Sequence, residues 1–136
     1  MRLLLALLAV SAAVPGAWGV VDPHGFYAAF PGGGHHWVDR LGAYDQHLVL
    51  DVGAFYLAFA LLLAWAALRP SRELIVPACT AFALFSAIHL GFHAAHLRGF
   101  PTADAAGETA SLALVLAGAV AAAWRAARRP PAPRRS

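Results

Sequence analysis

Four long apolar runs constrain the fold of this chain more than any other feature of its sequence. They cover residues 3–20, 47–68, 74–97 and 107–124 and contain few charged residues. An α-helix rises 1.5 Å per residue, so about 20 apolar residues cross the roughly 30 Å hydrocarbon core of a bilayer. The runs therefore predict an all-α four-helix transmembrane bundle that forms a single membrane domain over residues 1–124.

Composition supports a membrane protein over a soluble one. Hydrophobic residues make up 60% of the chain and charged residues 12%, against about 45–50% and about 25% in typical soluble proteins. The single cysteine, Cys79, excludes an internal disulfide and a cysteine-based zinc site. All ten basic residues are arginines near the ends of the runs, which indicates membrane topology rather than nucleic-acid binding. The expected partner is the lipid bilayer, with a second copy of the chain or another membrane protein as a further candidate.

The arginines also predict an orientation. Arg2, the turn "RPSRE" at residues 69–73 and the five arginines of the tail lie on one side of the alternating topology, and only Arg40 and Arg98 lie on the other. Cytoplasmic loops carry an excess of basic residues. We therefore expect a multi-pass plasma-membrane protein with both termini in the cytoplasm. Residues 125–136, "RAARRPPAPRRS", are predicted to form a disordered, basic cytoplasmic tail.

The first run allows a second interpretation. "MRLLLALLAVSAAVPGAWG" also resembles a signal peptide that ends in small residues at 17–19. Cleavage would leave three spans with unchanged sidedness and place the new N-terminus outside. We favour a retained span, because the aromatic segment that follows needs a surface on which to pack.

That segment, residues 20–46, is rich in aromatic residues and glycine. Phe26, Tyr27, Phe30, Trp37 and Tyr44 suit an interfacial position, with their rings at the depth of the lipid headgroups. Three consecutive glycines at 32–34 permit a sharp turn that larger residues would not tolerate. We expect an extracytoplasmic interfacial loop that folds over the outer mouth of the bundle.

Polar chemistry collects at the same end of the predicted bundle. All seven histidines, and every acidic residue except Glu73, fall on the outer side or in the outer halves of the spans. His89, His93 and His96 share one helix face, because residues three and four apart lie on the same side of a helix. His47 and Asp51 form a similar pair on the preceding span. Ionisable residues in a span usually face the bundle interior, so these side chains are expected to converge.

Imidazoles and carboxylates without cysteine suit zinc, copper or iron. The predicted metal ligands are His47, Asp51, His89, His93 and His96, and Glu108 is a further candidate. Two histidines from facing helices would alternatively hold a haem iron. The leading hypothesis is thus an outward-facing site that binds a transition metal or haem and serves membrane redox chemistry or metal handling.

The alternative is a structural or accessory membrane protein whose histidines and acids only brace helix contacts. Buried polar networks lock helix packing without any ligand, and Asp104 and Glu108 lie where helix N-terminal acids are common. No phosphate-binding loop, nucleophile elbow or HExxH motif is present, so the sequence leaves enzymatic activity open. A proton-coupled transporter is disfavoured, because the inner halves of the spans are almost purely apolar.

Two stretches carry a family resemblance. "FYAAFPGGGHHWVDRLGAYDQHLVLDVGAFYLAFALLLA" and "IHLGFHAAHL" resemble a group of small uncharacterised integral membrane proteins from actinobacteria. More loosely, the chain is similar to four-helix DoxX-like membrane proteins, some of them linked to quinone-dependent oxidation. Where the group has a Tyr-Asn-Glu-His-like entry to the second span, residues 44–47 read Tyr-Asp-Gln-His. The resemblance implies four spans and a membrane location, and it implies no particular reaction.

Overall fold

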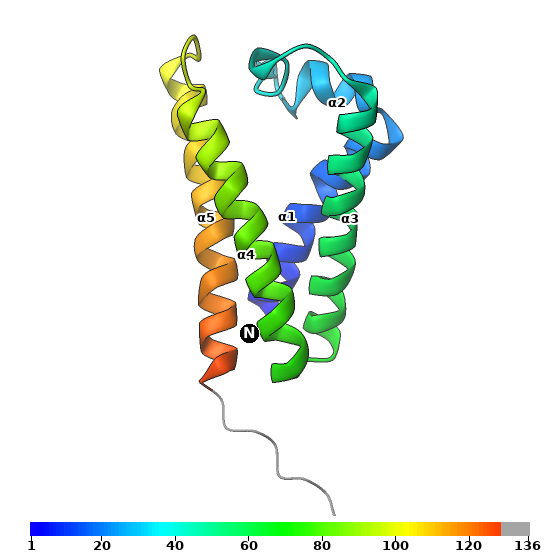
Figure 1. Cartoon of the computed structure of the whole chain (residues 1–136), viewed down its shortest axis with the longest axis vertical. Coiled ribbons are helices and arrows are strands. Elements are labelled where there is room, and N and C mark those ends of the chain that lie inside the picture. Colours follow the sequence, from blue (N-terminus) through cyan, green and yellow to red (C-terminus); the bar gives the residue numbers. More distant parts are fainter. Residues whose placement is uncertain (129–136) are drawn as a thin grey trace, which may run out of the picture.

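In the computed structural model, which describes residues 1–128, the chain is almost entirely helical (Figure 1). The long helices are α1 (Arg2–Val21), α3 (Gln46–Leu68), α4 (Arg72–Ala95) and α5 (Thr102–Ala127). Between α1 and α3 lie the short helix α2 (Pro23–Ala29), strands β1 (Pro31–Gly32) and β2 (His35–His36), and the 3₁₀ helix η1 (Asp39–Leu41). All four long helices are long and apolar enough to cross a membrane, so the prediction of four such helices is confirmed.

Two helices differ in extent from the apolar runs that predict them. α4 ends at Ala95 rather than at residue 97, which leaves His96 as its C-terminal cap. α5 begins at Thr102 rather than at residue 107, because Pro101 ends the connecting turn and the alanine-rich segment after it favours helix. The apolar residues of α5 mark the part of the helix that fits in hydrocarbon, whereas the helix itself begins before them. Consequently Asp104 lies on α5 rather than in the connection before it, together with Glu108.

The last helix also extends beyond residue 124, the predicted end of the membrane domain. α5 continues to Ala127, so residues 125–127 of the predicted tail are helical. The remainder of that tail, residues 129–136, lies outside the described residues.

Side-chain caps fix where three helices begin. The carboxylate of Asp22 accepts a hydrogen bond from Gly25 N at 2.9 Å at the start of α2, and Asp45 accepts one from Leu48 N at 3.1 Å at the start of α3. The Ser71 hydroxyl accepts one from Leu74 N at 3.2 Å at the start of α4. These bonds satisfy amide groups that have no partner within the helix.

The four long helices form two pairs, since α1 packs chiefly on α3 and α4 chiefly on α5. Glycines bring the first pair close together. A methyl group added at Gly16 would lie only 3.0 Å from Gly53 O and from Leu57 N, both backbone atoms of α3. Such small-residue contacts are typical of helices that pack in membranes. The two pairs diverge towards the end that carries α2 (Figure 1).

Two halves of the molecule follow from this divergence. We call residues 2–12, 60–68, 72–82 and 119–127 the packed half, and the end that carries α2 the loop half. The packed half holds the core of buried apolar residues, namely Leu5, Leu8, Ala9, Ala12, Ala60, Leu63, Ala66, Ile75, Cys79, Phe82, Ala119, Ala122 and Ala126. The small residues of α5 allow it to lie against its neighbours there.

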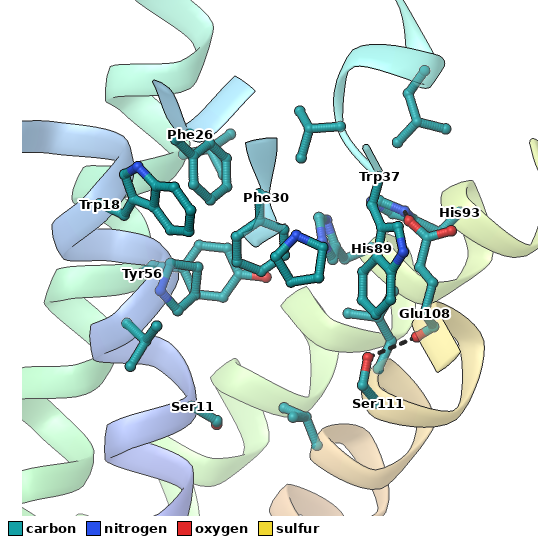
Figure 2. Close-up of a pocket in the computed structure, with 18 of the residues that line it drawn as sticks. Ser11, Trp18, Phe26, Phe30, Trp37, Tyr56, His89, His93, Glu108 and Ser111 are labelled. Carbon is teal, nitrogen blue, oxygen red and sulfur yellow. Dashed lines mark hydrogen bonds and ion pairs between the residues drawn. The ribbon is translucent and has the colours of Figure 1, made fainter. Parts of the chain in front are cut away.

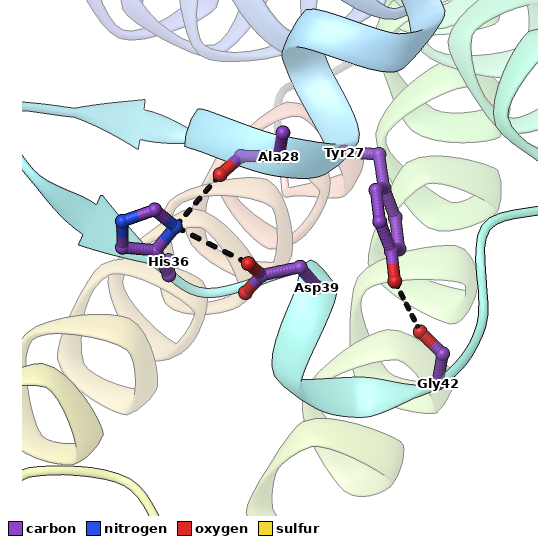
Figure 3. A network of polar contacts seen from close by, with 5 residues as sticks. All are labelled: Tyr27, Ala28, His36, Asp39 and Gly42. Atoms are coloured by element: carbon purple, nitrogen blue, oxygen red, sulfur yellow. Dashed lines mark hydrogen bonds and ion pairs between the residues drawn. The ribbon is translucent and has the colours of Figure 1, made fainter.

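The segment between α1 and α3 folds on itself over the loop half (Figure 3). His36 Nδ1 lies 2.7 Å from Ala28 O and 3.2 Å from Asp39 Oδ2, and the Tyr27 hydroxyl donates to Gly42 O at 2.7 Å. The predicted glycine turn is confirmed, because residues 32–34 all have positive φ angles between the two strands. Residues 22–45, which we call the capping segment, are therefore an ordered cap rather than a free linker.

A candidate binding chamber in the loop half

A chamber of about 500 Å³ lies between the two helix pairs in the loop half. The pair α1 and α3 forms one wall, the pair α4 and α5 forms the facing wall, and the capping segment covers the end. Aliphatic side chains supply much of the lining, namely Val14, Val38, Leu41, Leu48, Val49, Val52, Leu112 and Val115. The divergence of the helix pairs thus creates a cavity of the size of small-molecule sites.

Aromatic rings form the side of the chamber next to α1 and α2. The Trp18 ring lies edge-on to Phe26 at 6.2 Å and to Phe30 at 6.0 Å, and the Phe26 and Phe30 rings are 4.8 Å apart. These separations are those of mutually stabilising aromatic pairs. Figure 2 shows this cluster on one side of the chamber, with Tyr56 of α3 beside it.

Polar groups gather on the side formed by α4 and α5. Ser86, His89 and His93 of α4 line the chamber, as do Glu108 and Ser111 of α5. Two of the three histidines that were expected on one face of this helix, His89 and His93, therefore line the chamber. The His89 and His93 rings are 4.4 Å apart, and His89 stacks on the Phe85 ring at 5.6 Å. The chamber thus has one aromatic side and one hydrogen-bonding side.

A buried ion pair or hydrogen-bonded pair joins the two helices of this polar side. His93 Nδ1 lies 2.5 Å from Glu108 Oε1. The side chain of His93 is 10% exposed and that of Glu108 only 2%. A carboxyl group at this depth needs a partner, because an unpaired buried charge is strongly unfavourable. His93 supplies that partner for one of the two oxygens.

Two polar atoms at the chamber wall have no such partner. Within residues 1–128, neither Glu108 Oε2 nor Trp37 Nε1 makes a hydrogen bond, although both atoms are buried. Both residues line the chamber. The Trp37 ring also lies against α5, since a methyl group added at Gly107 would be 3.4 Å from its Cζ2 atom. Figure 2 shows Trp37, His93 and Glu108 together on the polar side.

The capping segment is held to the opposite helix pair by contacts beside the chamber. His35 Nδ1 lies 2.5 Å from Asp104 Oδ1 on α5, and the Arg40 guanidinium lies over the Phe100 ring at 5.7 Å. Asp104 is buried, whereas the His35 side chain is 49% exposed. These contacts link the capping segment to the side of the loop half formed by α4 and α5.

The remaining predicted ligands lie elsewhere. His47 and Asp51 contact each other at 3.3 Å, but their side chains are 82% and 54% exposed and face away from the chamber. His96 is exposed, and its Nδ1 lies 2.7 Å from Phe92 O. The expectation that all five side chains converge is therefore wrong. Leu48 and Val52 take the place on α3 that the prediction gave to His47 and Asp51.

The structure does not gather a metal site from these residues. In the described part of the chain, no group of three or more His, Cys, Asp or Glu side chains is placed to hold a metal ion. Glu108, the additional candidate, is the residue that the structure does bring to His93. The metal and haem predictions consequently have at most His89, His93 and Glu108 to rest on.

Sequence reasoning missed most of the chamber wall. Tyr56 received no role, Trp37 was expected only at the membrane interface, and Glu108 was mainly interpreted as a residue that complements the helix N-terminus. One signal was available, because Glu108, Ser111, Leu112 and Val115 repeat at the three- and four-residue spacing of a single helix face. All four residues lie within the predicted run 107–124, so this face could be recognised from the sequence.

Comparisons with known proteins give no further guidance. No protein-family model, curated protein or solved structure matches the chain. Any functional conclusion therefore rests on the chamber itself.

Proposed function

We propose that the protein is a polytopic membrane protein that binds a lipophilic small molecule in the loop-half chamber. The observation that carries this proposal is a mostly apolar cavity of about 500 Å³ with a few polar side chains on one side of its lining, among them His89, His93 and Glu108. Ligand sites in proteins are mostly apolar and contain a few placed polar groups that orient the ligand. This chamber has that composition.

Energetics support a bound occupant. A buried acceptor without a hydrogen bond costs about 1–3 kcal/mol, and chamber walls that face empty space lose dispersion contacts. A ligand with an apolar body restores the dispersion contacts, and its polar group can contact the polar side of the chamber. Such molecules concentrate in bilayers, and the four apolar helices support a bilayer environment for the protein.

The proposal includes an orientation. The arginine distribution favours cytoplasmic termini, so the loop half and its chamber belong to the extracytoplasmic leaflet of the plasma membrane. The aromatic residues of the capping segment then lie at headgroup depth. A ligand would enter from the outer leaflet or from the outer aqueous side.

The test is equilibrium binding of tritiated 2-naphthol to the full chain in nanodiscs, with empty nanodiscs as the baseline. We expect saturable binding to the wild-type protein and its loss in Leu112→Trp, because a large ring at Leu112 fills the chamber. Leu114→Trp is the matched control, since Leu114 is 73% exposed on another face of α5. Equal binding by both variants, or none by the wild type, would contradict the proposal.

The second candidate function is purely structural. It is favoured by the His93–Glu108 contact, which ties α4 to α5 inside the protein. Under this alternative the chamber binds no probe, and Glu108→Ala lowers stability without removing any ligand. Saturable 2-naphthol binding that Leu112→Trp removes would decide against it.

The metal or haem prediction is tested on the same purified protein. Elemental analysis and an absorption spectrum report any bound ion or haem. A stoichiometric metal or a haem band that disappears in His93→Ala and persists in His47→Ala would favour that function, because His93 lines the chamber and His47 does not. Metal-free and colourless protein that binds 2-naphthol supports the lipophilic ligand instead.

A further inference from the structure

We infer that the chamber takes its ligand sideways from the bilayer, through a window between α3 and α4. This inference rests on the proposed function and narrows its ligand class to neutral molecules that reside in the surrounding hydrocarbon. It comes from a change along the seam between these two helices, the line along which they face each other. The seam is closed by side chains in the packed half and opens beside the chamber.

Aromatic rings close the seam as far as the chamber. The Phe59 ring of α3 lies 5.1 Å from Phe82 and 5.4 Å from Phe85 of α4. The Tyr56 ring, nearer the chamber, lies edge-on to Phe85 at 5.1 Å and to His89 at 6.0 Å. Such ring pairs are mutually stabilising. Tyr56 and His89 both line the chamber, so this pair forms the edge of the window towards the packed half.

The same two helix faces continue towards the capping segment without ring contact. Residues seven apart share a helix face, because seven residues make about two turns. Val52 lies two turns beyond Phe59 on α3, and it is 37% exposed. Phe92 lies two turns beyond Phe85 on α4 and is 48% exposed, and its two ring contacts, at 5.9 and 4.1 Å, are with residues of α4 itself. The two helices therefore separate here, as their divergence in Figure 1 shows.

The other edges of the window are also defined. Leu48 and Val52 form its α3 side, because both line the chamber and are exposed, Leu48 at 58%. Phe92 forms its α4 side. The capping segment bounds the remaining edge, where the Arg40 guanidinium lies over the Phe100 ring of the connection between α4 and α5. The two sides of the window are thus apolar, which suits passage of a molecule from hydrocarbon rather than from water.

The opposite seam, between α1 and α5, is bridged by rings instead. The Trp18 ring of α1 lies 6.0 Å from Phe30, and the Phe30 ring lies 6.3 Å from Trp37. A methyl group added at Gly107 of α5 would lie 3.4 Å from the Trp37 ring. The capping segment thus spans from α1 to α5. Within residues 1–128, no comparable row of rings spans the seam between α3 and α4 beside the chamber.

The route and the lining together define the ligand class. No lysine or arginine lines the chamber in the described residues, so an anionic group has no cation to pair with there. A charged group is also costly to move through hydrocarbon. The ligand is therefore a neutral molecule that is dissolved in the leaflet around the loop half.

A probe that cannot leave the bilayer tests this route. The probe is a phosphatidylcholine whose acyl chain ends in a naphthyl group, and the matched lipid has the same chain without that group. Nanodiscs that contain the full chain are assembled with either lipid and titrated with tritiated 2-naphthol. We expect the naphthyl lipid to weaken the apparent affinity for 2-naphthol about tenfold relative to the matched lipid, because its tethered ring reaches the chamber from the side and competes there.

A substitution at the rim tests the location of the window. Phe92 does not line the chamber, so Phe92→Ala widens the window without changing the site. We expect 2-naphthol to associate and dissociate about threefold faster or more, with an unchanged ratio of the two rates, because the passage is altered and the bound state is not. Stopped-flow fluorescence of 2-naphthol measures both rates. Leu84→Ala is the control, because Leu84 is 64% exposed on α4 and lies away from the chamber.

Thermal unfolding checks that each variant is folded, and Phe92→Leu replaces Phe92→Ala if the alanine variant is not. Unchanged 2-naphthol affinity in the presence of the naphthyl lipid overturns lateral entry and leaves the chamber as a lipophilic site that fills from water. Wild-type rates in folded Phe92→Ala overturn the window between α3 and α4. They point instead to the seam between α1 and α5, where Val14 lines the chamber and is 56% exposed. Absence of saturable 2-naphthol binding to the wild-type protein overturns the proposed function itself.

Discussion

The two halves of this molecule are built from the same four long helices, yet they are packed in opposite ways. In the packed half the side chains between the helices are apolar and buried, and Leu5, Leu63 and Phe82 are 0% exposed. The loop half holds every buried polar or charged side chain of the described residues, namely Ser86, His93, Asp104 and Glu108. It also holds the chamber.

The difference shows how a small membrane protein can combine a stable fold with a site. Inside a bilayer, helices associate through close packing and hydrogen bonds rather than through the hydrophobic effect. The packed half uses alanines on α5 to bring helices together. The loop half keeps the helix pairs apart, joins α4 to α5 through the His93–Glu108 contact, and links the two pairs through the capping segment. Stability and binding are therefore expected to respond to different residues.

The largest expected effect compares the same substitution in the two halves. Leu63→Ala in the packed half should destabilise the protein by about 2–5 kcal/mol, because it leaves a cavity among fully buried side chains. Leu112→Ala should cost about 1 kcal/mol or less, since that side chain already borders the chamber and loses few contacts. Unfolding by SDS in mixed micelles measures both. Similar costs would remove the distinction between the halves.

A second comparison concerns the contact within a helix pair. Gly16→Ala should cost about 1–3 kcal/mol, because its new methyl group would lie 3.0 Å from backbone atoms of α3 that cannot move aside. Gly91→Ala on α4 is the matched control. Nothing lies within 4 Å of its added methyl group, so it should be neutral or slightly stabilising. The same SDS titration compares them, and a harmless Gly16→Ala would contradict the close packing of α1 on α3.

The third prediction asks whether the buried pair stabilises the loop half. Glu108→Ala should cost about 1–3 kcal/mol, because it leaves the buried His93 ring without its partner. Replacing both residues, in His93→Phe with Glu108→Leu, should restore much of this loss, since no polar group is then left unsatisfied. A stable double variant that no longer binds 2-naphthol would show that the pair serves ligand recognition. A double variant as unstable as the single one would favour the structural alternative.

The sequence predicts the helices well because the requirement for apolar residues in a span is local and strong. The start of α5 does not follow from hydropathy, since hydropathy reports the hydrocarbon segment and not the polar helical turns beyond it. The polar first turns of α5 show this most clearly, because they are helical and carry Asp104 and Glu108. The glycine turn at residues 32–34 was predictable for the same local reason as the helices, namely its backbone conformation.

The site was only partly predictable because it depends on which helices pair. His89 and His93 follow from helical spacing alone, and both line the chamber. The prediction for His47 and Asp51 assumed that ionisable side chains in a span face inward, whereas the structure leaves both exposed near the start of α3. The start of α3 resembles the membrane–water interface more than the membrane interior. The rule that ionisable side chains face inward therefore does not apply to His47 and Asp51. The role of Trp37 depends on how the segment between α1 and α3 folds back on α5, and the spacing of residues in the sequence does not reveal this.

The smallest expected effect concerns the contact that closes the loop half. His35→Ala removes the contact with Asp104, and because the His35 side chain is 49% exposed we expect a stability change of about 1 kcal/mol or less. The chamber should respond more than the fold does, since the capping segment loses a link to α5 while the packed half is untouched. We therefore expect faster dissociation of 2-naphthol and faster amide hydrogen exchange at residues 33–41, with unchanged exchange at residues 60–68. His24→Ala is the control, because His24 is exposed on α2 and does not line the chamber. Uniformly faster exchange in both halves would mean that the halves unfold as one unit, and the loop half would then not be an independently opening site.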